Sequence, residues 1–250
     1  MQAIILAAGQ GRRLRDPRGR PKCLREVGGL PLVHHQIRAL NAFGVDDVSI
    51  VVGHQQHQIR SCVGSAAGYV VNPRYAETNS MYSFLLARRI IHDDLIVMNS
   101  DLFFHPSLVR RLLEPGDDAL LYDSGSGEED EQMKVRVAGD RLVEMSKVMS
   151  SERVSGENVG ILSLSLSTAQ QAIEAASAIA ARGFERAWLA SAINQIAPAH
   201  PIRCVDVAGA PWVEIDFPED LERARVEVLP GVATFDDELV GSQRASGGFS

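Results

Sequence analysis

A glycine turn followed by dense positive charge is the part of the chain best suited to chemistry. Gly9 and Gly11 come directly after the apolar segment 3–7, which is typical of a buried parallel strand. Glycine lets the backbone approach a ligand closely, and exposed amides in such a turn bind anions. The next eleven residues carry six basic side chains against a single acid, Asp16: Arg12, Arg13, Arg15, Arg18, Arg20 and Lys22. This pattern predicts a loop that holds a triphosphate.

The spacing in this loop departs from two common phosphate-binding motifs. The pattern G-x-G-x-x-G would need glycine at the position of Leu14, and no Gly-Lys-Ser/Thr follows as in a P-loop. Residues 6–14 and 21–22 instead read L-A-A-G-x-G-x-R-L and P-K, which resembles the signature of nucleotidyltransferases that make sugar nucleotides and CDP-alcohols. The resemblance implies that Arg13 holds the β- and γ-phosphates and Lys22 the α-phosphate. It implies these further nucleotide contacts: Leu6, Ala7, Ala8, Gly9, Gly11 and Arg12.

A polar segment at 72–83 is the second candidate binding region. Thr78, Asn79 and Ser80 are good N-terminal caps for a following helix, but capping explains one of the three. An Asn side chain and free amides at a helix start also suit the edge of a base. The segment resembles one in bacterial phosphocholine cytidylyltransferases, which favours CTP. By that resemblance, the cytosine and ribose pocket is lined by Thr78, Asn79, Ser80 and Ser83.

Two acids far apart in the chain are candidates for a metal site. Asp101 follows the apolar run 95–98, and a carboxylate at the carboxyl end of a buried strand suits Mg²⁺; the alternative is a cap for the next turn. Residues 212–224 read W-x-E-I-D-x-P-E-D-L-x-x-A, which resembles the second metal-binding motif of these transferases. The resemblance implies that Asp101 and Asp216 share one Mg²⁺ as cofactor, with Ser100 beside the nucleotide.

The middle of the chain predicts a β-hairpin. After an acidic loop at 123–132, residues 133–137 and 142–145 form short alternating segments around a Gly-Asp turn. Exposed lysines here are usually solvated charge, but the order M-K-V, S-K and G-E-N-V-G-I resembles the acceptor-binding half of the cytidylyltransferases. The resemblance places Lys147 on the acceptor phosphate and Glu157 at its organic end. The expected acceptor contacts are Lys147, Glu157, Lys134, Tyr82 and Glu214, with Tyr75 and Trp212 as further candidates for a quaternary ammonium.

Alternating strand and helix patterns predict one α/β domain. We expect a Rossmann-like fold with a mainly parallel central sheet flanked by helices, similar to glycosyltransferase-A, plus a small β-hairpin subdomain for the acceptor. At 250 residues and 45% apolar, the chain can bury a large core. The expected domain spans 1–229, with 123–165 as the hairpin insertion and return strand and 230–250 as a flexible tail.

Composition limits the partners. A net charge of −7, with basic residues concentrated in one loop, argues against nucleic-acid binding. The odd number of cysteines, without C-x-x-C spacing, indicates neither a disulfide framework nor a zinc site. No signal peptide and no apolar run of membrane-spanning length is visible, so we expect no membrane partner and a cytoplasmic location. A homodimer remains open.

Together these features predict a Mg²⁺-dependent cytidylyltransferase. A phosphate or phosphonate oxygen of a small acceptor attacks the α-phosphorus of CTP, and pyrophosphate leaves. That oxygen is already ionised, so no general base is needed, which agrees with the lack of a convincing catalytic histidine. The alternatives are a sugar-1-phosphate nucleotidylyltransferase using dTTP, UTP or GTP, and a regulatory nucleotide-binding domain without catalysis. The acceptor stays open between phosphocholine, a phosphonate, and an inositol or sugar phosphate.

Overall fold

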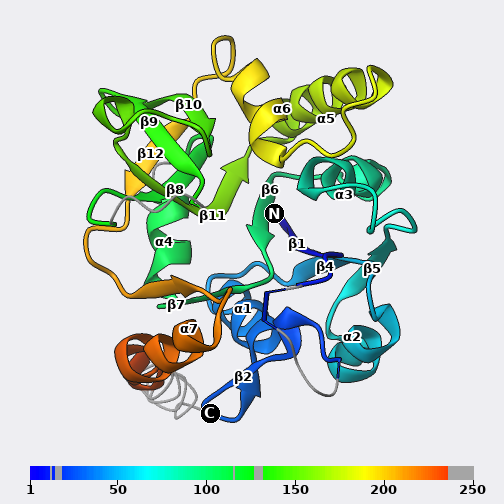
Figure 1. The fold of residues 1–250 in the computed structure, drawn as a ribbon, viewed down its shortest axis with the longest axis vertical. Helices are drawn as coiled ribbons and strands as arrows, with labels where there is room; N and C mark the ends of the chain where they lie inside the picture. The colour runs from blue at the N-terminus through cyan, green and yellow to red at the C-terminus, as the bar shows by residue number, and fades with distance from the viewer. Residues whose placement is uncertain (12, 15–18, 115, 127–131, 236–250) are drawn as a thin grey trace, which may run out of the picture.

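A nine-stranded mixed sheet forms the centre of the computed structural model (Figure 1). The spatial order of its strands is β5-β4-β1-β6-β11-β8-β12-β10-β9. The expected Rossmann-like α/β fold with helices on a central sheet is confirmed. Arg12, an expected nucleotide contact, lies outside the part of the chain that the structure describes. That part comprises residues 1–11, 13–14, 19–114, 116–126 and 132–235.

The first half of the chain builds four parallel strands whose carboxyl ends meet at one edge. In the middle of this group, Ile5 of β1 lies opposite Ile50 of β4 on one side and Met98 of β6 on the other. These apolar runs are buried from both faces, as is usual in a parallel sheet. The four strands are β5 (Gly68–Val71), β4 (Asp47–Val52), β1 (Gln2–Ala7) and β6 (Leu95–Asn99).

The second half of the sheet changes direction at β11. This strand returns antiparallel between β6 and β8, so the sheet is parallel in its first half and mixed beyond it. The predicted hairpin is present as β9 and β10, and β9 also pairs with the start of β11 at Glu157. The strands of this half are β11 (Gly156–Leu164), β8 (Ala119–Asp123), β12 (Arg203–Asp206), β10 (Arg141–Ser146) and β9 (Lys134–Ala138).

Helices cover both faces of the sheet. Because side chains alternate along a strand, Ile5 faces one helical layer and its neighbour Ile4 faces the other. The first layer consists of α1 (Leu32–Asn41), α2 (Gln56–Val63) and α4 (Ser107–Leu113). The second layer consists of α3 (Ser80–Leu86), α5 (Leu166–Ala181) and α6 (Leu189–Ile196), seen at the upper right of Figure 1.

Short elements complete the chain. Among the helices of the described ranges, none combines the length and apolar character needed to cross a bilayer. The small strands are β2 (Glu26–Val27), β3 (Leu30–Pro31), β7 (Leu102–Phe104) and β13 (Trp212–Glu214). The 3₁₀ turns are η1 (Lys22–Leu24), η2 (Gly64–Ala66), η3 (Ala87–Arg89) and η4 (Ser151–Arg153).

The C-terminal helix corrects the expected tail. α7 (Pro218–Arg223) begins at a proline, passes through the π-helical turn η5 (Ala224–Val228) and continues as helix to residue 235. Val232 is only 4% exposed and packs with the cluster that also buries Leu14 and Phe103. The expectation of a flexible tail from residue 230 is therefore wrong for 230–235, and residues 236–250 lie outside the described part.

Candidate active site

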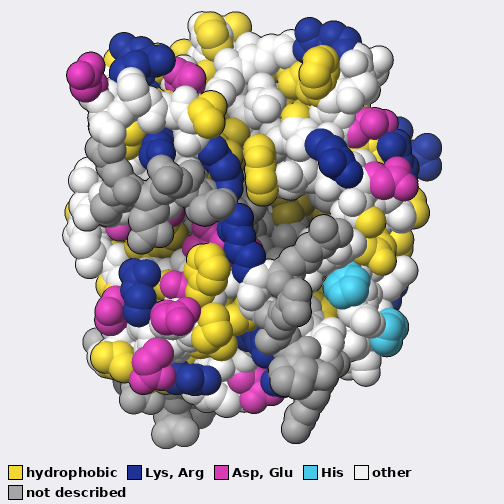
Figure 2. All heavy atoms as spheres, in the orientation of Figure 1, with side chains coloured by type: hydrophobic (Ala, Val, Ile, Leu, Met, Phe, Trp, Pro, Cys, Tyr) yellow, Lys and Arg dark blue, Asp and Glu magenta, His cyan; other side chains and the backbone are white. Residues whose placement is uncertain are grey.

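A cavity of about 570 Å³ opens over the carboxyl ends of β1 and β6, between the hairpin and helices α3 and α6. Figure 2 shows this face hollowed near its middle, with Lys and Arg side chains along the hollow. Open α/β sheets bind ligands at this edge. Thirteen of the site residues predicted from sequence line the cavity: Leu6, Ala8, Gly9, Arg13, Lys22, Thr78, Asn79, Ser80, Ser83, Asp101, Lys147, Glu214 and Asp216.

The basic loop places two cations against one carboxylate. The Lys22 ammonium contacts the carboxylate of Asp216 and lies 3.4 Å from Oδ2 of Asp101. Arg13 Nη1 donates to Asp216 Oδ2 at 3.0 Å. Gly11, with φ at +55°, leaves room for the Lys22 side chain, because a Cβ at this position would lie 2.7 Å from Lys22 Cγ. Gly11 therefore shapes the path of Lys22 and does not itself line the cavity.

Three carboxylates converge at the floor of the cavity. One oxygen from each of Asp101, Glu214 and Asp216 lies within 4.8 Å of the other two. Glu214 and Asp216 are two positions apart in an extended segment, which puts both side chains on the same side. The backbone N–H of Ile215 donates to the carbonyl of Asp101 at 2.9 Å and joins the two segments. Chain positions more than a hundred residues apart thus meet at one point.

Asp220 holds this segment in place. Its Oδ2 accepts from the backbone N–H groups of Asp216 at 2.9 Å and Phe217 at 2.7 Å. These are donors that the start of α7 would otherwise leave unpaired. Asp220, in the first turn of α7, therefore also fixes the backbone at Asp216, whose carboxylate belongs to the cluster.

The charges of the cluster are strongly coupled. Burial, together with Asp101 and Asp216, raises the pKa of Glu214 to about 8. Burial also raises the pKa of Asp101, although the Lys22 ammonium opposes it. For Asp216, Lys22 and Arg13 outweigh the effect of burial and lower the pKa. Burial acts against the charge of Lys22, but the facing carboxylates outweigh it and raise its pKa. The positive charge of Lys22 and Arg13 is therefore too small to balance the three carboxylates Asp101, Glu214 and Asp216.

The residues present fit a divalent cation. Oδ1 of Asp101 is buried and has no hydrogen-bond partner among the described residues. A buried acceptor without a donor is costly, and carboxylate oxygens are the ligands that Mg²⁺ prefers. Asp101, Glu214 and Asp216 would hold such an ion. Glu214, expected at the acceptor, lies with the two aspartates instead, because the E-I-D spacing turns it toward them.

Polar side chains at the start of α3 form the side of the cavity where the nucleotide was expected. Asn79 caps the helix: its Oδ1 accepts from the backbone N–H of Ser80 at 2.8 Å. Asn72 donates to Thr78 Oγ1 at 3.0 Å and to Ser83 Oγ at 3.1 Å. Capping and cavity lining thus coexist in one segment. Asn72 lines the cavity too and was missed, although its place directly after β5 is a usable signal.

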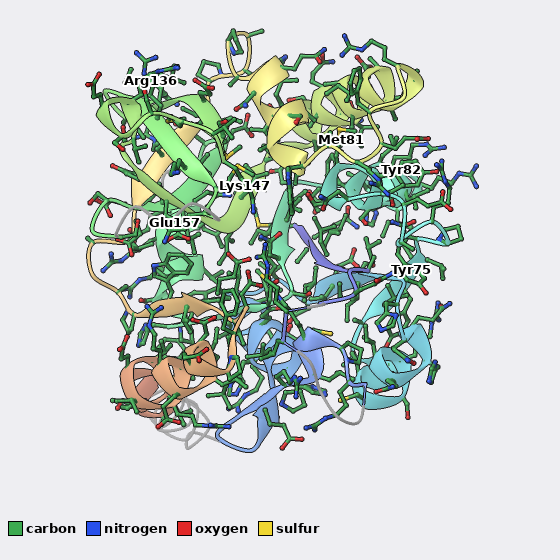
Figure 3. All side chains as sticks on the ribbon, in the orientation of Figure 1. Tyr75, Met81, Tyr82, Arg136, Lys147 and Glu157 are labelled. Carbon is green, nitrogen blue, oxygen red and sulfur yellow. The ribbon has the colours of Figure 1, made fainter. Side chains whose placement is uncertain are left out.

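The hairpin and the N-terminus of α6 form the side of the cavity where the acceptor was expected. The Lys147 ammonium lies 4.7 Å from the ring centroid of Trp188, and both side chains line the cavity. Figure 3 shows Lys147 near the centre of the molecule, between the hairpin and α6. Sequence reasoning missed Trp188 as a lining residue. No local pattern marks it, because its position depends on how α6 packs. Asn158 also lines the cavity, beside the bulge in β11.

Several predicted contacts lie outside the cavity lining. Lys134 and Glu157 are each 8% exposed, and the Lys134 ammonium donates to the carbonyl of Lys147 at 3.4 Å. Lys134 therefore holds the backbone of the hairpin segment at Lys147. Tyr82 lies under the Arg74 guanidinium, 5.4 Å from its ring centroid, on the far side from the hairpin (Figure 3). The remaining residues of this group are buried beside the cavity: Ala7 and Ser100.

Replacing Gly11 by alanine is expected to lower kcat about tenfold, because the new Cβ would displace the Lys22 side chain it meets at 2.7 Å. Gly44→Ala is the matched control. Gly44 also has a positive φ, +76°, but a Cβ there meets nothing within 4 Å. Both variants should lose about 1 kcal/mol of stability to backbone strain, measured by denaturant unfolding. Steady-state kinetics then separate them, and equal kcat values for both would contradict the role of Gly11.

Comparison with known proteins places this site in a family. Residues 3–190 match the MobA-like NTP transferase domain. The chain is 34% identical over 244 residues to a bifunctional IPC transferase and DIPP synthase of Rubrobacter xylanophilus. That alignment covers 94% of this chain and 53% of the relative, so the chain spans about half the relative's length. It is also 39% identical over 118 residues to a CMP-5'-(3-aminopropyl)phosphonate synthase of Streptomyces rubellomurinus, covering 45% of this chain and 19% of the relative.

A solved structure supports the same assignment at the level of the fold. The inositol-1-phosphate CTP transferase from T. maritima superposes with a TM-score of 0.76 at 21% identity, covering 91% of this chain and 97% of that one. Because the family match spans most of the chain, including the basic loop and Asp101, the protein belongs to the family of MobA-like NTP transferase domains.

Proposed function

We propose that the protein is a cytidylyltransferase that moves CMP from CTP to a phosphate or phosphonate oxygen of a small acceptor. The acceptor oxygen forms a bond to the α-phosphorus, the bond from that phosphorus to the bridging oxygen breaks, and pyrophosphate leaves with the electron pair. One observation carries the proposal: a single cavity is lined by the basic loop, the three carboxylates and the polar start of α3.

The cationic and the anionic side chains of the cavity would bind different groups. Arg13 and Lys22 face the space above the carboxylates and would bind the phosphates of the nucleotide. A divalent cation on Asp101, Glu214 and Asp216 would neutralise charge on these phosphates. The acceptor oxygen is ionised near neutral pH, so catalysis needs positioning and charge stabilisation and no proton transfer.

CTP is favoured by the relatives and by the lining of the nucleotide side. Two relatives carry cytidine nucleotides in their names: the CMP-phosphonate synthase of Streptomyces rubellomurinus and a CTP:phosphoglutamine cytidylyltransferase of Campylobacter jejuni, 21% identical over 249 residues. Asn79 and Ser83 line this side with an amide and a hydroxyl, groups that can both donate and accept, which suits the amino and carbonyl edge of cytosine.

The acceptor is proposed to be a small phosphorylated alcohol or a phosphonate, with its anionic group on Lys147. The aromatic side chains expected around a quaternary ammonium do not form a cage within the described residues. Tyr75 lines the cavity, whereas the Trp212 indole donates to Asp123 at 2.8 Å and Tyr82 faces Arg74. We therefore favour acceptors such as inositol 1-phosphate or an aminoalkylphosphonate over phosphocholine.

CTP is expected to bind at least about tenfold more tightly than dTTP, GTP or ATP, which corresponds to about 1.4 kcal/mol. Calorimetric titration of each nucleotide with Mg²⁺ measures this preference. A tenfold preference for dTTP would instead support a sugar-1-phosphate nucleotidylyltransferase.

Pyrophosphate release with each nucleotide and a panel of acceptors tests the reaction: inositol 1-phosphate, 3-aminopropylphosphonate, phosphocholine and glucose 1-phosphate. Binding without pyrophosphate release from any pair would indicate a regulatory domain.

A further inference from the structure

We propose that helix α6 connects the nucleotide side of the cavity to the acceptor hairpin, and that Asn194 is the positioning residue that sets Lys147 for the acceptor. The inference rests on the proposed function, since it assigns the acceptor to the hairpin side. It concerns contacts that lie outside the phosphate-binding loop and the carboxylate cluster.

Asn194 pairs with the edge of β10 through its side chain. Its Nδ2 donates to the carbonyl of Met145 at 2.8 Å, and its Oδ1 accepts from the backbone N–H of Met145 at 2.8 Å. The neighbouring strand β12 pairs with β10 at a single register position, Arg141 opposite Arg203. The rest of this edge of β10 would otherwise present unpaired backbone groups. The amide of Asn194 therefore acts in place of a missing strand.

This pairing bears directly on the acceptor side. Met145 lines the cavity, and Lys147, two positions later and just past the end of β10, lines it too. The Lys147 ammonium then lies over the ring of Trp188, the residue that precedes α6. The helix thus holds the hairpin at two points, one at Met145 and one at Lys147. A shift of β10 against α6 would move the Lys147 ammonium relative to the carboxylates.

The N-terminal end of α6 is tied to the nucleotide segment. The backbone N–H of Leu189 donates to Ser80 Oγ at 2.9 Å. Just before the helix, the carbonyl of Glu185 accepts from the backbone N–H of Asn79 at 3.2 Å. Ser80 and Asn79 belong to the proposed nucleotide contacts. A nucleotide that fixes them also fixes α6, and through Asn194 it fixes the hairpin before the acceptor arrives.

Asn194→Leu tests the connection, because leucine has a similar size but makes neither hydrogen bond. We expect the KM for the acceptor to rise about tenfold or more, while the KM for CTP stays within about twofold. Gln195→Leu is the matched control: it is the same kind of change on the next residue of α6, which is exposed, and both KM values should stay unchanged. Equal KM values for the acceptor in Asn194→Leu and wild type would overturn the inference.

Two further measurements keep the test decisive. Asn194→Asp is a second variant that keeps the test usable if Asn194→Leu folds poorly. It retains the acceptor for the Met145 N–H and loses the donor, so its KM for the acceptor should lie between the wild-type value and the rise expected for Asn194→Leu. Hydrogen exchange reports on the hairpin without turnover: Mg²⁺–CTP should slow exchange across 134–147 in wild type and not in Asn194→Leu. A lowered melting temperature with equal losses for both substrates would mean a merely structural role. Failure of the wild type to release pyrophosphate would count against the proposed function, while hydrogen exchange would still decide the role of Asn194.

Discussion

Lys22→Met is expected to lower kcat by a factor of about 10² to 10³ while the KM for CTP changes only a few-fold. Methionine keeps the length of the side chain and removes its charge. Lys22 follows Pro21, whose fixed φ limits the path of the chain, and its ammonium is directed to the carboxylate cluster at the cavity floor. We expect it to act on the α-phosphate as charge builds there during the attack, which is a contact that strengthens at the transition state.

Steady-state kinetics with saturating acceptor measure this effect. Arg20→Met is the matched control, because Arg20 belongs to the same basic loop but pairs with Glu26 at 3.3 Å and lies outside the cavity lining. Its kcat should stay within a few-fold of wild type. If Lys22→Met keeps its kcat and raises the KM for CTP instead, Lys22 serves binding of the ground state.

A second readout of Lys22→Met does not depend on turnover. The Lys22 ammonium pairs with both Asp101 and Asp216 and would compete with a divalent cation for them. Removing it should tighten Mn²⁺ binding by roughly tenfold, the size expected for one close charge near a protein surface. Electron paramagnetic resonance counts the free Mn²⁺. Weaker Mn²⁺ binding in the variant would show that Lys22 supports the metal site.

The parts of the site that sequence could predict are those encoded by local pattern. The apolar run before Gly9 predicts a strand, which is present as β1, and the segment after it brings Gly9, Arg13 and Lys22 to the cavity. Asp101 was predicted from the same kind of signal, since it comes shortly after the buried run of β6, and it lines the cavity. These signals lie in consecutive residues, so no knowledge of packing is needed to read them.

The parts that were missed depend on contacts distant in sequence. Trp188 and Asn194 act on a hairpin more than forty positions earlier, and neither stands in a pattern that points to it. Glu214 was assigned to the acceptor although its spacing to Asp216 puts both on one side of an extended segment. The tail was expected to begin at residue 230, yet the chain continues as helix through Pro230 after the π-helical turn η5.

Asp101→Asn and Asp216→Asn are each expected to lower kcat by about 10³, because an amide cannot balance the charge of a divalent cation. An asparagine has nearly the same shape as aspartate, so the fold should survive, and circular dichroism with thermal unfolding checks this. Asp46→Asn, at an exposed position after α1, is the control and should retain full activity. Mn²⁺ titration of the two site variants should show binding weakened by about 10-fold or more relative to this control.

The double variant decides whether the two aspartates serve the same ion. Their carboxylates lie together with Glu214 within 4.8 Å, and Asp101 Oδ1 has no donor among the described residues. If both ligate one cation, the first substitution already abolishes its function, so the double variant should be hardly worse than either single one. Independent sites would instead multiply the two losses to about 10⁶. A fully multiplicative loss, with Mn²⁺ binding intact in Asp101→Asn, would mean that Asp101 acts on the substrate or on Lys22 and that the cation rests on Glu214 and Asp216.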